Sequence, residues 1–182
     1  MSKAIIFDID DTLITTKERK ILALNRISSH PELQTIPNIQ CLQHLTPKNA
    51  PNEYGIEQAL IQCQISSEFL PTIKSKWLDV FLNNSGMYQN GKVVGKNIPG
   101  SVTTVNLAYK QGFHIYYLTG RHHDPIHNDS MKQGTLDELS THGFPLPNDR
   151  NVYLMMKDQP NPNNLATPAR QLNDAEYKKR AV

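Results

Sequence analysis

The stretch that decides the fold runs from Ala4 to Leu13 and reads AIIFDIDDTL. Its apolar beginning, rich in isoleucine and phenylalanine, is typical of a short strand buried on both faces of a parallel sheet. Acidic residues follow directly at positions 8, 10 and 11. In extended backbone, residues two apart point the same way, so Asp8 and Asp10 are predicted to present two carboxylates on one side.

The carboxylates of Asp8 and Asp10 predict a metal-assisted site. Two neighbouring negative charges repel each other, and a bound cation would relieve that repulsion. Hard oxygen ligands suit Mg²⁺, which commonly takes one or two carboxylates together with phosphate oxygens. Asp8 would attack phosphorus to form an aspartyl-phosphate, and Asp10 would protonate the leaving oxygen and later activate water. The alternative is an acidic turn that caps a helix. A calcium loop of EF-hand type is excluded, because its glycine position holds Leu13 and its twelfth position holds Arg19.

Two further apolar runs, 114–118 and 152–156, are predicted to be buried strands. A helical pattern at 101–111 precedes the first of them. A second helical pattern, which begins at Ser130 and ends at Gly143, separates the two. This alternation of strands and helices predicts an α/β fold built on a doubly wound parallel sheet.

Residues between the first strand and Pro99 have a different character and predict a helical insertion. The expected helices cover 17–28, 53–64 and 67–83. Polar segments rich in proline, asparagine and glycine separate or close them. We therefore expect residues 1–16 and 96–182 to form an α/β catalytic core, and residues 17–95 to form a helical cap over a site carried by the sheet.

The tripeptide Thr119-Gly120-Arg121 directly follows the predicted strand at 114–118. In a parallel sheet, ligands bind outside the carboxyl ends of the strands. A threonine hydroxyl and the free amides of a turn at that place can hold phosphate oxygens, and Gly120 permits close approach of the backbone. Two roles stay open for Arg121: it adds positive charge for a phosphate, or it pairs with a nearby acid.

These motifs resemble those of the haloacid dehalogenase superfamily of phosphatases. The first motif of that family, Asp-x-Asp-x-Thr-Leu after a strand, is matched by residues 8–13, and the second, a Thr or Ser after a strand, is matched by Thr119. The motif also has a third acidic residue, Asp11, and in this it resembles the branch that contains class B acid phosphatases and polynucleotide 3′-phosphatases. The segment 17–95 stands where that family has a helical cap.

The resemblance implies a role for each matched residue. Asp8 would be the nucleophile and Asp10 the general acid and base, with Mg²⁺ against the Asp8 side chain and the Asp10 backbone carbonyl. The implied phosphate-binding residues are Thr12, Thr119, Gly120 and Arg121. The family's third motif is a lysine near the start of a later helix, and Lys178 is the preferred candidate ahead of Lys179 and Lys157.

The fourth motif of the family, an acidic pair after a further strand beyond the lysine, is missing, because the sequence ends at Val182. The family's sheet also continues on the far side of the first strand. Without that continuation, residues 4–7 would form an exposed apolar edge, which natural proteins avoid. We expect that the chain is shortened relative to a working protein; the other explanation is that something else, such as a second copy in a homo-oligomer, covers the edge.

Composition bounds the class of protein and its partners. A hydrophobic fraction of 38% with 20% charged residues is typical of a globular protein, and a net charge of +2 is too small to indicate nucleic-acid binding. No apolar run approaches the roughly 18 residues that span a bilayer, and no signal peptide precedes the first strand. A cytoplasmic protein is therefore expected, with Cys41 and Cys63 as reduced thiols.

The sequence therefore predicts a magnesium-dependent phosphohydrolase that acts on a small phosphomonoester, with nucleic-acid ends still open as substrates. Two alternatives remain: a phosphate- or metal-binding or interaction protein without turnover, and a fragment of a longer hydrolase. The histidines His122, His123 and His127 either form a transition-metal cluster or belong to a polar loop beside the site, and the loop is preferred.

Overall fold

The computed structural model describes residues 3–49, 56–82, 84–123, 130–148, 150–158 and 178–179. The chain divides into two compact units, a core unit of residues 1–15 and 95–182 and a helical unit of residues 16–94. Each unit has a hydrophobic core of its own. The roles of catalytic core and cap, with the boundaries given above, stay predictions.

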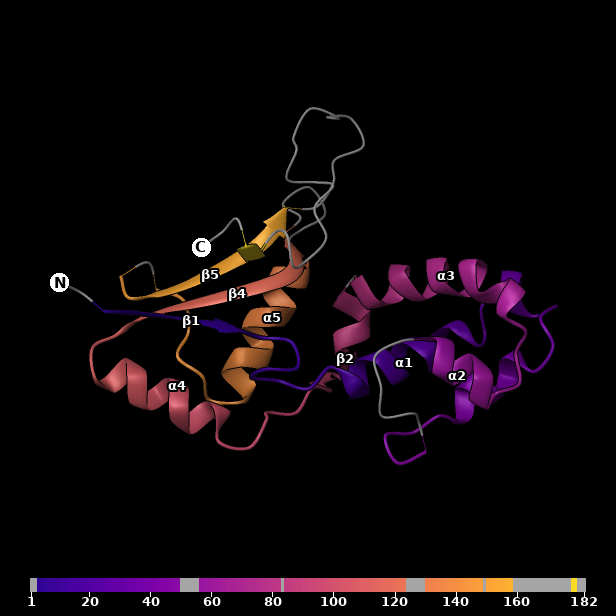
Figure 1. Ribbon diagram of the computed structural model, residues 1–182, viewed down its shortest axis with the longest axis horizontal. Coiled ribbons are helices and arrows are strands. Elements are labelled where there is room, and N and C mark those ends of the chain that lie inside the picture. Colours follow the sequence, from indigo (N-terminus) through magenta and orange to yellow (C-terminus); the bar gives the residue numbers. More distant parts are fainter. Residues whose placement is uncertain are drawn as a thin grey trace. The chain divides into compact units, whose positions relative to one another are not determined.

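Three parallel strands form the sheet of the core unit, and they lie in the order β1 (Ala4–Asp8), β4 (His114–His123) and β5 (Val152–Asp158) (Figure 1). Helix α4 (Ser101–Lys110) precedes β4, and helix α5 (Ser130–Thr141) connects β4 to β5. The predicted α/β fold with a parallel sheet is therefore confirmed.

One face of the sheet is covered by α4 and α5. The side chains that meet there alternate along each strand, as the pleat requires, and form one cluster that includes Phe7, Ile115, Tyr117, Val152, Val105, Ala108 and Leu139. Figure 1 shows both helices on the same side of the strands. The doubly wound arrangement, which also needs helices on the opposite face, stays a prediction.

Strand β1 lies at an edge of the three-stranded sheet as the described residues define it. Its register pairs Ile6 with Tyr116 and Asp8 with Leu118 of β4. Ile6 points away from α4 and α5 and is 45% exposed. An exposed apolar edge strand can pair with another chain. Association of two copies through β1 stays a prediction.

Strand β4 is longer than predicted. The sequence placed Thr119, Gly120 and Arg121 in a turn after the strand, but β4 continues to His123. Its pairing with β5 shifts at this point, because Thr119 pairs with Met156 and His122 with Lys157. Two residues of β4 are thus accommodated without partners on β5, as in a β-bulge, which re-aims side chains near the end of a strand.

The helical unit contains helices, short 3₁₀ turns and a small hairpin. Its α-helices are α1 (Lys17–Ile27), α2 (Ile56–Gln62) and α3 (Leu70–Leu82). Its 3₁₀ turns are η1 (Pro31–Leu33), η2 (Ile39–His44), η3 (Ser67–Phe69) and η4 (Asn84–Met87), and its hairpin joins β2 (Tyr88–Gln89) to β3 (Lys92–Val93). A helical region after β1 fits a cap insertion. Within the described ranges, every helix is too short or too polar to traverse a bilayer.

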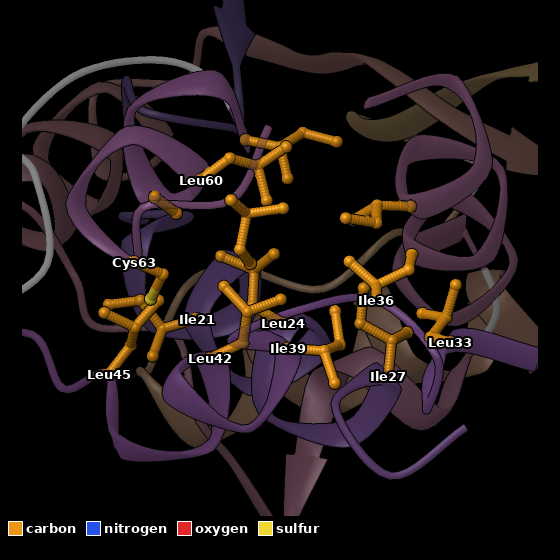
Figure 2. Packing of buried hydrophobic residues seen from close by; sticks show 14 residues of the cluster. Ile21, Leu24, Ile27, Leu33, Ile36, Ile39, Leu42, Leu45, Leu60 and Cys63 are labelled. Carbon is orange, nitrogen blue, oxygen red and sulfur yellow. The ribbon is translucent and has the colours of Figure 1, made fainter. Parts of the chain in front are cut away.

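The core of the helical unit is aliphatic. Residues Ile21, Leu24 and Ile27 of α1 recur at helical spacing and face inward. They pack against side chains from η2 and α2, such as Leu42 and Leu60 (Figure 2). A stable core of this kind lets the unit hold its own shape.

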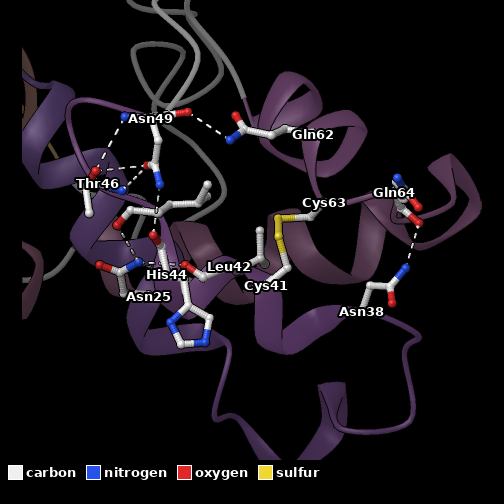
Figure 3. Close-up of a disulfide and its surroundings, with 11 residues drawn as sticks. Asn25, Asn38, Cys41, Leu42, His44, Thr46, Asn49, Gln62, Cys63 and Gln64 are labelled. Carbon is white, nitrogen blue, oxygen red and sulfur yellow. Dashed lines mark hydrogen bonds between the residues drawn. A yellow bond between two sulfur atoms is a disulfide. The ribbon is translucent and has the colours of Figure 1, made fainter.

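A disulfide links Cys41 of η2 to Cys63, which follows α2 (Figure 3). The prediction of reduced thiols is therefore wrong. The chain brings the two Cα atoms to 5.6 Å, which lies within the range that a disulfide spans. Surrounding hydrogen bonds fix the same region, including one from the Asn38 side chain to the carbonyl of Gln64 at 3.3 Å. The thiols were predicted from the expected cytoplasmic compartment, which carries no information on this proximity.

Removing the disulfide is expected to destabilise the helical unit. The bond closes a loop with a sequence separation of 22, for which loss of chain entropy in the unfolded state corresponds to about 3 kcal/mol. The fluorescence of Trp77, the only tryptophan, reports this unit, because its indole stacks on Phe81 and donates to the carbonyl of Lys20. We expect urea unfolding followed by Trp77 fluorescence to shift to lower denaturant in Cys41→Ala/Cys63→Ala. Dithiothreitol should produce the same shift in the wild type and none in the variant; a wild type insensitive to reductant would contradict the expectation.

Candidate active site

A tight turn follows β1, which ends at Asp8, and carries the acidic residues Asp10 and Asp11. The carbonyl of Ile9 accepts hydrogen bonds from the amides of Leu13 and Ile14, at 2.9 and 3.0 Å. The amide of Asp11 donates to the carbonyl of Ile14 at 2.8 Å, and Asp11 has a φ of 57°. Aspartate is among the few residues that adopt this left-handed conformation readily. The chain therefore turns back at Asp10 and Asp11, directly after the carboxyl end of the strand.

Lys178 contacts the carboxylate of Asp8. Its Nζ lies 2.6 Å from Oδ1 of Asp8, and both side chains are about one-third exposed, at 30% and 34%. The two residues are far apart in the sequence, and the lysine lies in a helical segment of the chain. The structure thus places the preferred third-motif lysine against the predicted nucleophile.

Asp10 is held from the neighbouring strand by Arg121 and Thr119. Arg121 donates from Nε to both carboxylate oxygens at 3.1 Å and from Nη2 to Oδ1 at 2.7 Å. The hydroxyl of Thr119 donates to Oδ2 at 3.2 Å and accepts from the amide of Arg121, also at 3.2 Å. Several charge-assisted hydrogen bonds to one carboxylate fix its orientation. The role of Arg121 that the sequence left open is thus pairing with an acid.

A second carboxylate, Glu138 of α5, lies on the other side of Arg121. Its Oε2 is 2.7 Å from Nη2 of Arg121, and the two side chains are only 2% and 3% exposed. Nη1 of the same guanidinium donates to the hydroxyl of Thr135 at 3.1 Å. Arg121 is therefore enclosed between two carboxylates, of which Asp10 is the more accessible at 27% exposed.

The charge state of Arg121 follows from these neighbours. Burial by itself would lower the pKa of the guanidinium, because it penalises the charged form. The negative charges of Asp10 and Glu138, with their hydrogen bonds, more than compensate, so the pKa of Arg121 is raised above its ordinary value. The guanidinium stays protonated and carries the only positive charge of this triad.

Gly95 leaves the space that Glu138 fills. A Cβ atom on Gly95 would lie 2.1 Å from Oε1 of Glu138 and 2.8 Å from Cγ2 of Ile14. The carbonyl of Gly95 lies 2.9 Å from Nε2 of His142, one turn after Glu138 on the same stretch of chain. A glycine is required here for the close approach of the backbone to the carboxylate rather than for an unusual φ angle.

The remaining predicted residues are placed as follows. Thr12 is exposed on the turn after β1, and Gly120 lies in the irregular part of β4. Thr119 is fully buried, with its hydroxyl directed at Asp10. His122 and His123 end β4, whereas His127 lies outside the described residues. Lys179 is exposed and Lys157 is buried in β5.

Sequence reasoning missed Glu138, Thr135 and Gly95. A signal for the first two is present in the helix, because Met131, Thr135, Glu138 and Leu139 recur at helical spacing and are all buried. A lone charged residue on a buried helix face needs a partner of opposite charge in the core. Nothing in the sequence around Gly95 indicates that a carboxylate from α5 lies against it.

The residues at this place fit Mg²⁺ in ligand type. Mg²⁺ usually takes one or two carboxylates and completes its shell with water and phosphate oxygens. Asp8 and Asp10 supply hard oxygen ligands, although the Asp10 side chain already contacts Arg121 and Thr119. Among the described residues, no group of three or more His, Cys, Asp or Glu side chains is arranged to hold a metal ion. A magnesium ion would therefore depend on the Asp8 carboxylate, the Asp10 carbonyl and the substrate.

Comparison of the sequence with protein-family models and with curated proteins gives no match.

Proposed function

We propose that this chain is a magnesium-dependent phosphohydrolase that cleaves a small phosphomonoester through an aspartyl-phosphate on Asp8. The observation that carries the proposal is the contact of Lys178 Nζ with Asp8 Oδ1 at 2.6 Å, because it joins a cation to a strand-end carboxylate. The resemblance to haloacid dehalogenase phosphatases, nearest the class B acid phosphatase and polynucleotide 3′-phosphatase branch, assigns these two residues to one site. A doubly wound core belongs to the same proposal.

In the first step a carboxylate oxygen of Asp8 attacks phosphorus, and the bond from phosphorus to the leaving oxygen breaks. Asp10 gives a proton to the leaving oxygen. In the second step Asp10 takes a proton from water, the water oxygen attacks phosphorus, and phosphate leaves with regeneration of the Asp8 carboxylate. The contacts of Arg121 with Asp10 stabilise the ionised carboxylate, which suits its role as the base of the second step.

Charge neutralisation and positioning provide most of the catalysis in this proposal. Transfer of a phosphoryl group passes through a loose transition state whose charge is spread over the equatorial oxygens. Lys178 would donate to these oxygens from its place beside Asp8, and Thr12 and Gly120 would line the phosphate position. Thr119 is buried and would act through its hydrogen bond to Asp10. Bound Mg²⁺ would supply further positive charge between Asp8 and the phosphate oxygens.

Substrate choice in this proposal belongs to the helical unit of residues 16–94. Its position after β1 in the sequence and its independent core support a cap, which would exclude water and select the substrate. Nucleotides, sugar phosphates, phosphorylated amino acids and nucleic-acid ends share the phosphomonoester chemistry.

A second candidate is a phosphate- or metal-binding protein without turnover. The contacts of the Asp10 carboxylate with Arg121 and Thr119 favour it, because they stabilise the ionised carboxylate over the protonated acid that the first step needs. It retains the same acids and the same lysine, so binding alone does not separate the two candidates. Turnover does.

Magnesium removal tests the proposal. We expect the chain to release p-nitrophenol from p-nitrophenyl phosphate with Mg²⁺, and to lose the activity when a chelator is added and recover it when excess Mg²⁺ is restored. Measurement of inorganic phosphate should give the same rate as measurement of p-nitrophenol. Binding of phosphate or Mg²⁺ with no turnover would overturn the proposal in favour of the second candidate.

A further inference from the structure

We propose that Glu138 is a positioning residue that acts on Asp10 through Arg121. This inference rests on the proposed function and adds to it a residue that lies outside the motifs and does not touch the substrate. Its basis is a continuous line of contacts, from the Glu138 carboxylate to the Arg121 guanidinium at 2.7 Å and from there to the Asp10 carboxylate at 2.7 Å.

The two ends of this line differ in accessibility. Glu138 is 2% exposed and has no route to a substrate, whereas Asp10 is 27% exposed. Both carboxylates share one nitrogen, Nη2 of Arg121, so a movement of Glu138 changes the direction in which that nitrogen points. The orientation of the accessible carboxylate is therefore set from the buried one.

The surroundings restrict both Glu138 and its partner Arg121. Gly95 allows no additional atom beside Oε1, and Thr135 accepts a hydrogen bond from Nη1 of Arg121 while donating to the carbonyl of Met131 at 2.8 Å. Groups that are locked by packing and by further hydrogen bonds are those that can keep a catalytic side chain in its productive geometry.

Stability alone does not explain a buried carboxylate at position 138. Buried ion pairs gain little over well-packed apolar residues of similar volume, because both charges must leave water. A leucine at position 138 facing an apolar residue at 121 would fill the same space. The buried pair of Glu138 and Arg121 is explained if a positive charge must lie inside the unit and hold the Asp10 carboxylate in one orientation.

The test compares two substrates that differ only in the leaving group. Phenyl phosphate needs protonation of its leaving oxygen more than p-nitrophenyl phosphate does, so loss of the acid function of Asp10 lowers kcat/KM more for phenyl phosphate. Asp10→Asn defines this signature. We expect Glu138→Gln to show the same difference between the two substrates. Its kcat/KM should fall by about tenfold or more for phenyl phosphate and by less for p-nitrophenyl phosphate. The loss should be in kcat rather than in KM.

A double variant separates action through Asp10 from a general loss of structure. If Glu138 acts through Asp10, Asp10→Asn/Glu138→Gln should be no slower than Asp10→Asn, because the effects of residues that act as a unit do not add. Asp137→Asn is the matched control, since this carboxylate is the neighbour on α5 and bonds to Gln133 at 2.8 Å. It should stay within about twofold of the wild type, the usual range for a surface change.

Thermal unfolding of each variant shows whether it is folded at the assay temperature. Should Glu138→Gln not fold, Thr135→Val carries the test, because it removes one hydrogen bond to Arg121 and buries no charge; a selective loss of a few-fold for phenyl phosphate is then expected. Equal losses for both substrates, or losses that add fully to that of Asp10→Asn, would overturn this inference alone. A wild type without magnesium-dependent turnover would overturn the proposed function and this inference with it.

Discussion

Asp8→Asn is expected to lower magnesium-dependent phosphate release by at least about a thousandfold, because an amide cannot replace a carboxylate as the attacking nucleophile. The change keeps the size of the side chain and leaves an oxygen that can still accept from Lys178, which lies 2.6 Å from Oδ1 in the wild type. Folding should therefore be nearly unchanged. The measurement is phosphate release under single-turnover and steady-state conditions, with intact mass after acid quench to detect the phosphorylated chain.

The neighbouring acid supplies the control for this prediction. Asp11→Asn removes the same charge three residues further along the chain, and asparagine accepts the φ of 57° as readily as aspartate does. We expect a loss smaller than about tenfold, as for a change in the local field alone. A phosphorylated species should appear in the wild type and in Asp11→Asn but not in Asp8→Asn. Activity in Asp8→Asn close to that of Asp11→Asn would show that Asp8 is not the nucleophile.

Much of the core unit could be predicted because its signals are local. The first strand is an uninterrupted apolar run, and the helices before and after β4 end at glycines with positive φ, Gly112 and Gly143, as expected for C-terminal stops. The end of β4 could not be predicted, because Thr119, Gly120 and Arg121 have the composition of a turn. Their conformation is decided by β5, which continues beside them, and such pairing between distant segments has no local signal.

The candidate site divides in the same way. Asp8, Asp10 and Thr119 come at the ends of apolar runs in the sequence and are visible as interruptions of a pattern. Glu138 was missed because its partner, Arg121, comes from a different element, and in the sequence Glu138 is one of three charged residues of α5 with nothing to single it out. The Cys41–Cys63 disulfide was missed for the same reason, since it depends on how η2 and α2 pack. The contact of Glu138 with Arg121 and the disulfide each need two elements to meet, and nothing local in the sequence indicates either of them.

Arg121→Met is expected to destabilise the core unit by about 3–5 kcal/mol, the range for removing one member of a buried ion pair. Methionine keeps most of the aliphatic volume, but the carboxylate of Glu138, 2% exposed, would lose the cation at 2.7 Å. Urea unfolding followed by hydrogen exchange of peptides from β4 and α5 measures the change where it occurs, because exchange reports the stability of each segment separately. Trp77 lies in the helical unit and is not a probe of this loss.

A compensating variant distinguishes an unpaired charge from a packing defect. In Arg121→Met/Glu138→Leu both charges are absent, so no buried carboxylate is left without its partner, and at least about half of the lost free energy should return. Asp10 keeps the hydrogen bond from Thr119 and is accessible to water in both variants. If the cause were volume alone, the double variant would be no more stable than Arg121→Met. The same double variant should remain inactive, because recovered stability does not restore the hydrogen bonds from Arg121 to the Asp10 carboxylate.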